Sequence, residues 1–114
     1  VTLSYRSALA ICGSGFFQAG TVSNATLTLT AKASVPFTIN QIRGLKTSAG
    51  TCTVAVQIGG VNVTGLSALA VTSSAQDATA SAANVVAVGD RVTLVITSAS
   101  SATDLEFTLK YTRA

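Results

Sequence analysis

Residues 104–111 read Asp-Leu-Glu-Phe-Thr-Leu-Lys-Tyr, and polar and apolar side chains alternate along the whole stretch. Successive side chains of a β-strand point to opposite faces, so a period of two places all the apolar members on one face. The apolar members are Leu105, Phe107, Leu109 and Tyr111, and the polar members are Asp104, Glu106, Thr108 and Lys110. The stretch therefore predicts a strand with one face in a core and the other in water.

Three earlier segments show the same alternation and predict three more strands. The inward sets are Ala25, Leu27, Leu29 and Ala31 in segment 24–31, Cys52, Val54, Val56 and Ile58 in segment 51–58, and Val92, Leu94 and Ile96 in segment 91–97. Threonine fills the outward positions of the first of these segments, at Thr26, Thr28 and Thr30. Residues branched at Cβ favour pleated, half-buried surfaces, which strengthens the prediction.

Two further segments predict strands from less regular patterns. The apolar positions of segment 1–11 are Val1, Leu3, Tyr5, Leu9 and Ile11, which indicates an N-terminal strand. Segment 35–45 begins with Pro36, which a strand start tolerates. Its apolar period then slips between Ile39 and Ile42, which indicates a β-bulge or a bend.

Segment 74–88 is open to two interpretations. The spacing from Ser74 to Asp77 could begin a short helix, and alanine favours that conformation. The alternation of Ala78 and Ala80 with Thr79 suits a narrow strand instead. We favour the strand.

Turn residues separate the segments at short intervals. Gly59-Gly60 predicts a two-residue hairpin, and residues 48–50, 88–90 and 98–101 predict further hairpins or short loops. About eight short strands with frequent turns and no long helix are typical of an antiparallel β-sandwich or a small barrel. We expect one all-β domain over residues 1–114, because a chain of 114 residues can bury one core. Residues 1–23 would be an N-terminal strand or an arm used in assembly.

Hydroxyl groups, rather than charges, supply most of the polarity. The chain contains 17 Thr and 13 Ser, and only 10% of its residues are charged. Its mean hydropathy is high, at +0.56, yet no apolar run reaches the ~18 positions of a membrane span. We therefore expect no transmembrane segment. We also expect no signal peptide, because no basic leader precedes an apolar stretch and a cleavage site.

The basic residues are too scattered to favour nucleic-acid binding. The net charge of +3 comes from seven basic residues, Arg6, Lys32, Arg43, Lys46, Arg91, Lys110 and Arg113. A surface that follows phosphates needs basic side chains gathered on one face, usually with stacking aromatic rings. We expect no nucleic-acid partner.

The side chains that most enzymes and metal sites use are scarce. The chain has no His, four acidic residues and two Cys, so bases, nucleophile pairs and ligand clusters are hard to assemble. We predict no catalytic residue, no cofactor and no metal site.

Asp90 follows Gly89 and indicates a turn. Asp104 and Glu106 share the outward face of the last strand, where Arg91 or Lys110 would neutralise them.

Cys12 and Cys52 allow two interpretations. A disulfide between them would close a loop of about 40 residues and contribute ~4 kcal/mol to stability. Alternatively, Cys52 fills an inward slot beside Val54 and Val56 as a small hydrophobic side chain. We favour the free thiol, because two cysteines without a secretory signal indicate a reducing place of synthesis.

Phe16 and Phe17 are the candidate interaction residues. Adjacent side chains of a strand cannot enter the same face, so one ring must lie over a sheet end, in a loop, or against a partner. We favour packing within the core, with a subunit interface as the second interpretation and a sugar-stacking platform as the third. Aromatic residues make up only 5% of the chain and Trp is missing, so a sugar site would have few rings.

A longer pattern of strands and turns covers roughly residues 35–113. Its parts are Thr-Ser-Ala-Gly-Thr-Cys-Thr-Val-Ala-Val-Gln-Ile-Gly-Gly at 47–60, Val-Asn-Val-Thr-Gly-Leu at 61–66, and Val-Ala-Val-Gly-Asp-Arg-Val-Thr-Leu-Val-Ile at 86–96. This order resembles the small jelly-roll modules of tailed-bacteriophage virion proteins, which also end in a strand like 105–111. The first 30 or so residues lie outside the resemblance.

The resemblance implies a jelly-roll β-sandwich and a non-enzymatic part of a bacteriophage or gene-transfer-agent particle. Such parts are head decorations, head fibres or spikes, or tail-tip modules, commonly assembled as homotrimers on major capsid or tail proteins. The location implied is the virion, assembled in the host bacterial cytoplasm, sometimes in contact with host surface glycan. No catalytic residue carries over. The alternatives are a carbohydrate-binding module for host glycan and a bacterial surface or pilus-like subunit.

Overall fold

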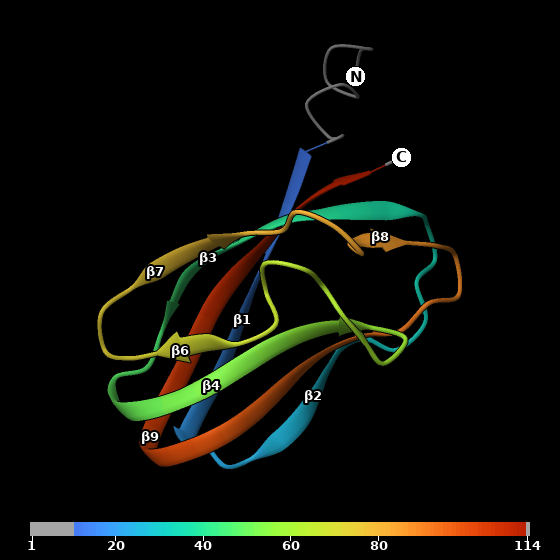
Figure 1. The fold of residues 1–114 in the computed structure, drawn as a ribbon. Helices are drawn as coiled ribbons and strands as arrows, with labels where there is room; N and C mark the ends of the chain where they lie inside the picture. Colours follow the sequence, from blue (N-terminus) through green and yellow to red (C-terminus); the bar gives the residue numbers. More distant parts are fainter. Residues whose placement is uncertain (1–10, 114) are drawn as a thin grey trace.

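Every regular element in residues 11–113, the part of the chain that this computed structural model describes, is a β-strand (Figure 1). The strands are β1 (Ile11–Thr21), β2 (Ala25–Thr30), β3 (Phe37–Lys46), β4 (Ala49–Ile58), β5 (Val61–Asn62), β6 (Leu69–Val71), β7 (Gln76–Thr79), β8 (Val85–Val86) and β9 (Val92–Arg113). The all-β prediction is confirmed. The strand predicted at 1–11 lies outside the described residues except for Ile11. The helix considered for 74–88 does not form, and β7 and β8 take its place.

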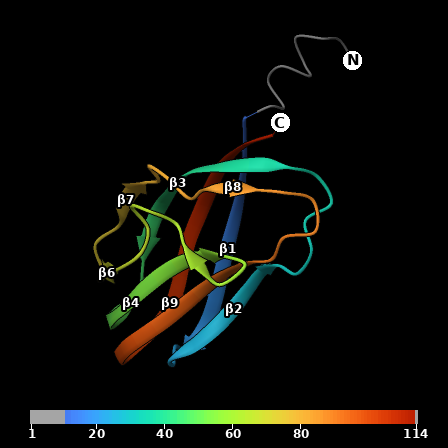
Figure 2. The same cartoon turned by 45° about the vertical axis from the view of Figure 1, so that its right-hand side comes forward.

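All nine described strands pair antiparallel in one curled sheet that is organised around β9. The first half of β9 pairs with β2 on one side and with β4 on the other, and the second half pairs with β1 and β3. Strands β5 and β6 extend the sheet beyond β4, while β7 and β8 extend it beyond β3. Figures 1 and 2 show β9 turning from the β2–β4 part of the sheet into the β1–β3 part.

A bend inside β9 replaces a predicted turn. Residues 98–101 were expected to separate two strands, but β9 runs unbroken through them for 22 residues, so that prediction was wrong. Ser98, Ser101 and Asp104 have φ angles of 52°, 50° and 53°, in the left-handed region. Single residues of this kind bend a strand and shift its pairing locally. The register of β4 on β9 shifts on both sides of Thr51, opposite this bend. The bend lets one strand serve both parts of the sheet.

Other local predictions are confirmed. The register of β3 on β9 shifts between Ile39 and Gln41, where the apolar period slips, so the expected bulge is present. Ile58 pairs with Val61 across Gly59-Gly60, whose φ angles of 58° and 85° are those of a tight hairpin. Asp90 is a turn residue as predicted, because its Oδ2 accepts the backbone N–H of Ala87 at 2.9 Å.

The core lies inside the curl and takes side chains from both parts of the sheet. Its fully buried large side chains are Ile39, Ile42, Leu45, Val54, Val56, Val63, Leu66, Val71, Val86, Leu94, Ile96 and Leu105. The predicted inward sets of 51–58, 91–97 and 104–111 are buried or half-buried. Segment 24–31 differs, because Leu27 and Leu29 are half-buried and Ala25 and Ala31 are exposed. Strand β2 forms one edge of the curl, so the core covers its inner face only in part.

Polar groups fasten the bend of β9 to its surroundings. The backbone N–H of Gly20 donates to Asp104 Oδ1 at 2.7 Å, and the Ser48 hydroxyl donates to Asp104 Oδ2 at 2.9 Å. These two donors hold the pKa of Asp104 below its usual value. The prediction that Arg91 or Lys110 neutralises Asp104 and Glu106 was wrong. Lys46 Nζ lies 3.9 Å from Glu106 Oε1, and Arg91 donates to the Thr28 hydroxyl at 2.8 Å.

Candidate interaction surface

An apolar groove opens between β1 and β2. Within residues 11–113 each of these strands pairs only with β9, so each has one edge without a described neighbour. The end of β1 and the start of β2 meet at a corner beside the β9 bend, and the two strands diverge from it (Figure 2). Val22 and Asn24 fix this corner, because the Val22 N–H donates to the Ala102 carbonyl and the Ala99 N–H donates to Asn24 Oδ1, both at 2.9 Å.

Two adjoining hollows make up the groove, and they share Phe16 and Leu29. The hollow nearer the corner is completed by Phe17, Gln18, Leu27, Thr28, Leu105 and Phe107. The hollow nearer the start of β1 is completed by Thr30, Val35, Phe37, Val92, Leu109, Tyr111 and Arg113. Among residues 11–113, Arg113 is the only charged residue in this lining, so the groove offers mainly hydrophobic contact.

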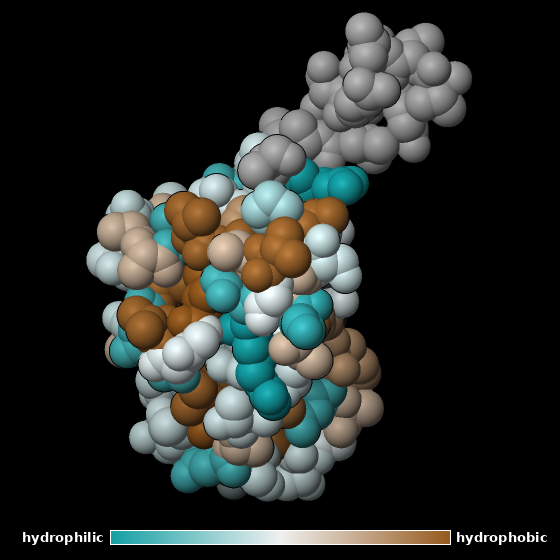
Figure 3. All heavy atoms as spheres, turned by 90° about the vertical axis from the view of Figure 1, so that its right-hand side faces the viewer, coloured by the Kyte–Doolittle hydropathy of each residue, from teal (hydrophilic) through white to brown (hydrophobic). Residues whose placement is uncertain are grey.

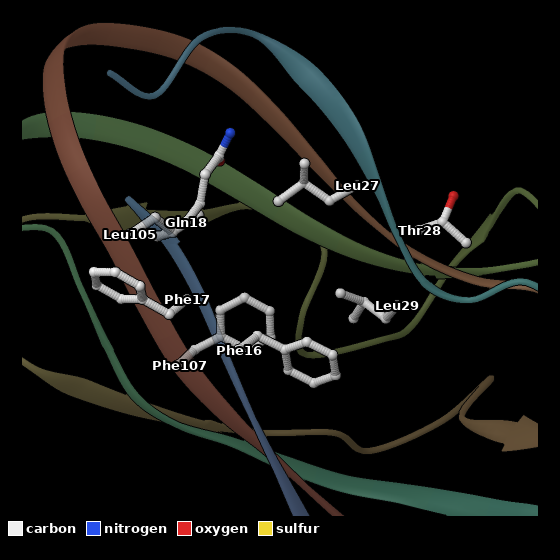
Figure 4. Close-up of a pocket in the computed structure, with 8 residues that line it drawn as sticks. All are labelled: Phe16, Phe17, Gln18, Leu27, Thr28, Leu29, Leu105 and Phe107. Atoms are coloured by element: carbon white, nitrogen blue, oxygen red, sulfur yellow. The ribbon is translucent and has the colours of Figure 1, made fainter. Parts of the chain in front are cut away.

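Phe16 forms the floor of the groove. Its ring stacks on that of Phe107 with centroids 5.0 Å apart and an interplanar angle of 22°. Leu27 and Leu29 point from β2 toward these rings (Figure 4). A second aromatic pair, Phe37 and Tyr111, has centroids 4.9 Å apart and lies at the other end. The expectation that one of the two adjacent phenylalanines packs with the core is confirmed for Phe16, which is half-buried against it.

Phe17 borders the hollow near the corner, but its ring points away from Leu27 and Leu29 and is 64% exposed (Figure 4). Its partner across the strands is Glu106, and glycines at positions 15 and 44 leave a shallow hollow beside its ring. Nearby, Gly44 donates its N–H to Asp77 Oδ1 at 2.9 Å, and Arg43 Nε lies 3.9 Å from Asp77 Oδ2. The ring lies on the outer face of a regular strand, not over a sheet end or in a loop, so the structure separates the two predicted residues.

Gln18 contributes an unpaired polar atom to the groove. Its side chain lines the hollow near the corner, and its Oε1 is buried without a hydrogen-bond partner among residues 11–113. A buried acceptor without a partner costs about 1–3 kcal/mol, so native proteins rarely leave one in place. A molecule in the groove would reach this acceptor only after the Gln18 side chain rotates, because the oxygen itself is buried.

Several groove residues were not recognised as interaction residues from the sequence. Leu27 and Leu29 were assigned to the core, because an edge strand that borders a groove has the same alternation as a strand that lines a core. Val35 borders the groove and is 39% exposed. Outside the groove, Val61, Val85 and Val88 are each more than 60% exposed. Figure 3 shows hydrophobic side chains gathered over the upper part of the end that carries β8. For Val35 and Val88 the available signal was an apolar side chain directly before Pro36 or Gly89.

The thiol of Cys52 is free and buried in the core, where the sequence placed it. Burial in apolar surroundings raises the pKa of this thiol. The Cys12 side chain lies outside the described part of the structure.

Among residues 11–113, no three His, Cys, Asp or Glu side chains lie together as a metal site would require. In the same residues, no helix has the length and apolar character to cross a membrane.

Comparison with known proteins gives no family for this chain. No protein-family model matches it. A search of curated proteins also finds no relative that matches. The function is therefore argued from the groove, the exposed hydrophobic side chains and the composition of the surface.

Proposed function

We propose that the chain is a non-enzymatic structural protein of a bacteriophage particle, which decorates the capsid or forms part of a fibre, spike or tail. In this proposal the domain is a jelly-roll module and a homo-oligomer, with the trimer favoured. The partners are other copies of the chain and the major capsid or tail proteins, and the location is the virion.

The observation that carries the proposal is the open apolar groove on a surface with few charges. Half-buried Phe16, Leu27 and Leu29 line the groove, and Val61, Val85 and Val88 are exposed elsewhere on the surface. Only 10% of the residues are charged. Threonine and serine hydroxyls are less costly to bury in a contact than unpaired ammonium or carboxylate groups. Such a surface is suited to permanent packing between protein copies.

The topology supports the jelly-roll part of the proposal. A jelly roll places two antiparallel layers face to face around one core. Here β9 joins a part built from β2, β4 and β6 to a part built from β1, β3 and β7, and both parts supply core residues. The bend of β9 would form the closed side of such a sandwich and the groove its open side.

Purified particles provide the test. Mass spectrometry of particles from the host should detect the chain at a fixed copy number, and gold-labelled antibody should mark one location on capsid or tail. Absence of the chain from washed particles would overturn the proposal. Light scattering of the isolated protein should give a mass above that of the 11.4 kDa chain, with three times that mass for the trimer.

Exposed Phe17 favours a second candidate, a module that binds host surface glycan. An aromatic ring offers an apolar face to a sugar ring, and Glu106 beside it provides an acceptor for sugar hydroxyls. A glycan array should then give signals that the Phe17→Ala variant lacks. An array without signals would exclude this candidate and leave the structural proposal untouched.

A further inference from the structure

We propose that residues 1–10 of a second copy of this chain fill the groove between β1 and β2 as an added β-strand. The inference rests on the homo-oligomer in the proposed function and names the contact that holds it together. The copies would exchange their N-terminal segments, so that each groove receives the segment of a neighbour.

The groove has the features that an added strand requires. Within residues 11–113, β1 and β2 each have one edge without a partner, and such edges pair readily with another extended segment. The floor between the edges is apolar and includes the half-buried side chains of Phe16, Leu27 and Leu29. One face of an added strand would cover these side chains. After a rotation of its side chain, Gln18, whose Oε1 has no partner among residues 11–113, would accept a hydrogen bond from the segment.

Residues 1–10 have the matching pattern. Val1, Leu3, Tyr5 and Leu9 share one face of an extended segment, on which Ser7 is the one polar residue. The other face carries small or polar residues, Thr2, Ser4, Arg6, Ala8 and Ala10. Ten extended residues span about 33 Å, which is comparable to the length of an eleven-residue strand such as β1. The segment can therefore reach along the groove and place its apolar face on the groove floor.

The position of Ile11 favours a neighbour's groove over the chain's own. Ile11 pairs with Thr112 at the open end of the groove, next to Phe37 and Arg113. To enter its own groove, the segment would have to reverse direction just before Ile11. Tight hairpins need residues that accept positive φ, mainly Gly, Asn or Asp, and residues 1–11 contain none of these. A segment that continues outward from β1 needs no such turn.

Two double variants of the chain, each with two added carboxylates, test this contact. Leu3→Asp with Tyr5→Asp places two carboxylates on the apolar face, whereas Thr2→Asp with Ser4→Asp places the same two charges on the polar face. Light scattering should show the first variant as a monomer and the second with the mass of the wild-type oligomer, and circular dichroism should show an intact sheet in both. If both keep the wild-type mass, or if both become monomers, the inference is overturned.

Cross-linking determines whose groove the segment occupies. The variant carries Leu3→Cys and Leu29→Cys in a Cys12→Ser background. The remaining native cysteine, Cys52, is buried and should not react. A short bis-maleimide should then give covalent dimers and higher species. A product that links the two sites within one chain would overturn the inference, because it places the segment in its own groove. No link between the two sites in a protein that forms oligomers would also overturn it, because another surface then joins the copies.

Different results would overturn the exchange of segments and the homo-oligomer of the proposed function. A wild-type chain that is monomeric at high concentration would overturn both the exchange of segments and the homo-oligomer of the proposed function. An oligomer that keeps its mass in the Leu3→Asp, Tyr5→Asp variant would overturn the exchange alone.

Discussion

Gly50, near the start of β4, lies directly against the carbonyl group of Ser101 in the bend of β9. A methyl group on the Gly50 Cα would overlap the Ser101 carbonyl and the backbone nitrogen of Ala102. The φ angle of Gly50 is 72°, in the left-handed region that favours glycine. The bend that lets β9 serve both parts of the sheet therefore depends on a residue without a side chain in the neighbouring strand.

The Gly50→Ala substitution should destabilise the protein strongly. The left-handed conformation and the clash with backbone atoms together should lower the free energy of unfolding by about 2–5 kcal/mol. Gly59→Ala is the matched control, because its φ is 58° and nothing lies within 4 Å of the added methyl group. That variant should lose only about 1–2 kcal/mol. Urea unfolding measures both, and equal losses would refute the close approach at Ser101.

Asp104 should make the stability depend on pH in the acid range. Its folded-state pKa is lowered by the Gly20 N–H and the Ser48 hydroxyl, so the unfolded chain binds a proton more readily than the folded chain. The stabilisation is complete above the unfolded-state pKa of about 4 and is lost as the pH falls through the folded-state pKa. We expect Asp104→Asn to be less stable than wild type at neutral pH, with a difference that shrinks in acid. A difference that is constant with pH would contradict the assigned bonds.

The two faces of β1 should respond differently to truncation of their aromatic contacts. Phe107→Ala removes a buried ring and its stacking with Phe16, so the free energy of unfolding should fall by about 3–5 kcal/mol. Phe17→Ala removes a ring that is 64% exposed, and its effect should stay within about 0.5 kcal/mol. Thermal and urea unfolding of both variants check this contrast. A large loss for Phe17→Ala would place that ring in a stabilising contact.

Cys52 should resist thiol reagents in the folded protein. Its burial excludes the reagent, and its raised pKa lowers the fraction of reactive thiolate at neutral pH. In a Cys12→Ser variant, DTNB should react slowly in buffer and completely in denaturing urea. Cys52→Ser should cost about 1–3 kcal/mol, because a hydroxyl group needs a hydrogen-bond partner that the surrounding valines do not supply. Rapid reaction of the native thiol would contradict its position in the core.

Local patterns predicted much of the fold, for reasons that particular residues make plain. The alternation at 51–58 and 104–111 gave the inner faces of two strands, since the period of two belongs to the backbone itself. The slip between Ile39 and Ile42 gave the bulge in β3, and the glycines at 59 and 60 gave the hairpin. A strand was one of two options for residues 1–23, and β1 (Ile11–Thr21) lies within that range. The bounds of β1 were not predicted, because its glycines and its adjacent aromatic residues interrupt the alternation.

The sequence by itself determined an all-β chain with a hydroxyl-rich surface and an aliphatic core, because these properties follow from composition and from neighbours along the chain. Tertiary structure alone decided that residues 98–101 continue a strand, since the close approach of Gly50 and the bonds of Asp104 hold that bend from other segments. It also decided that Leu27 and Leu29 border a groove instead of filling a core. An alternating strand has the same pattern in either place, and only the position of β2 at the edge of the curl leaves these side chains uncovered.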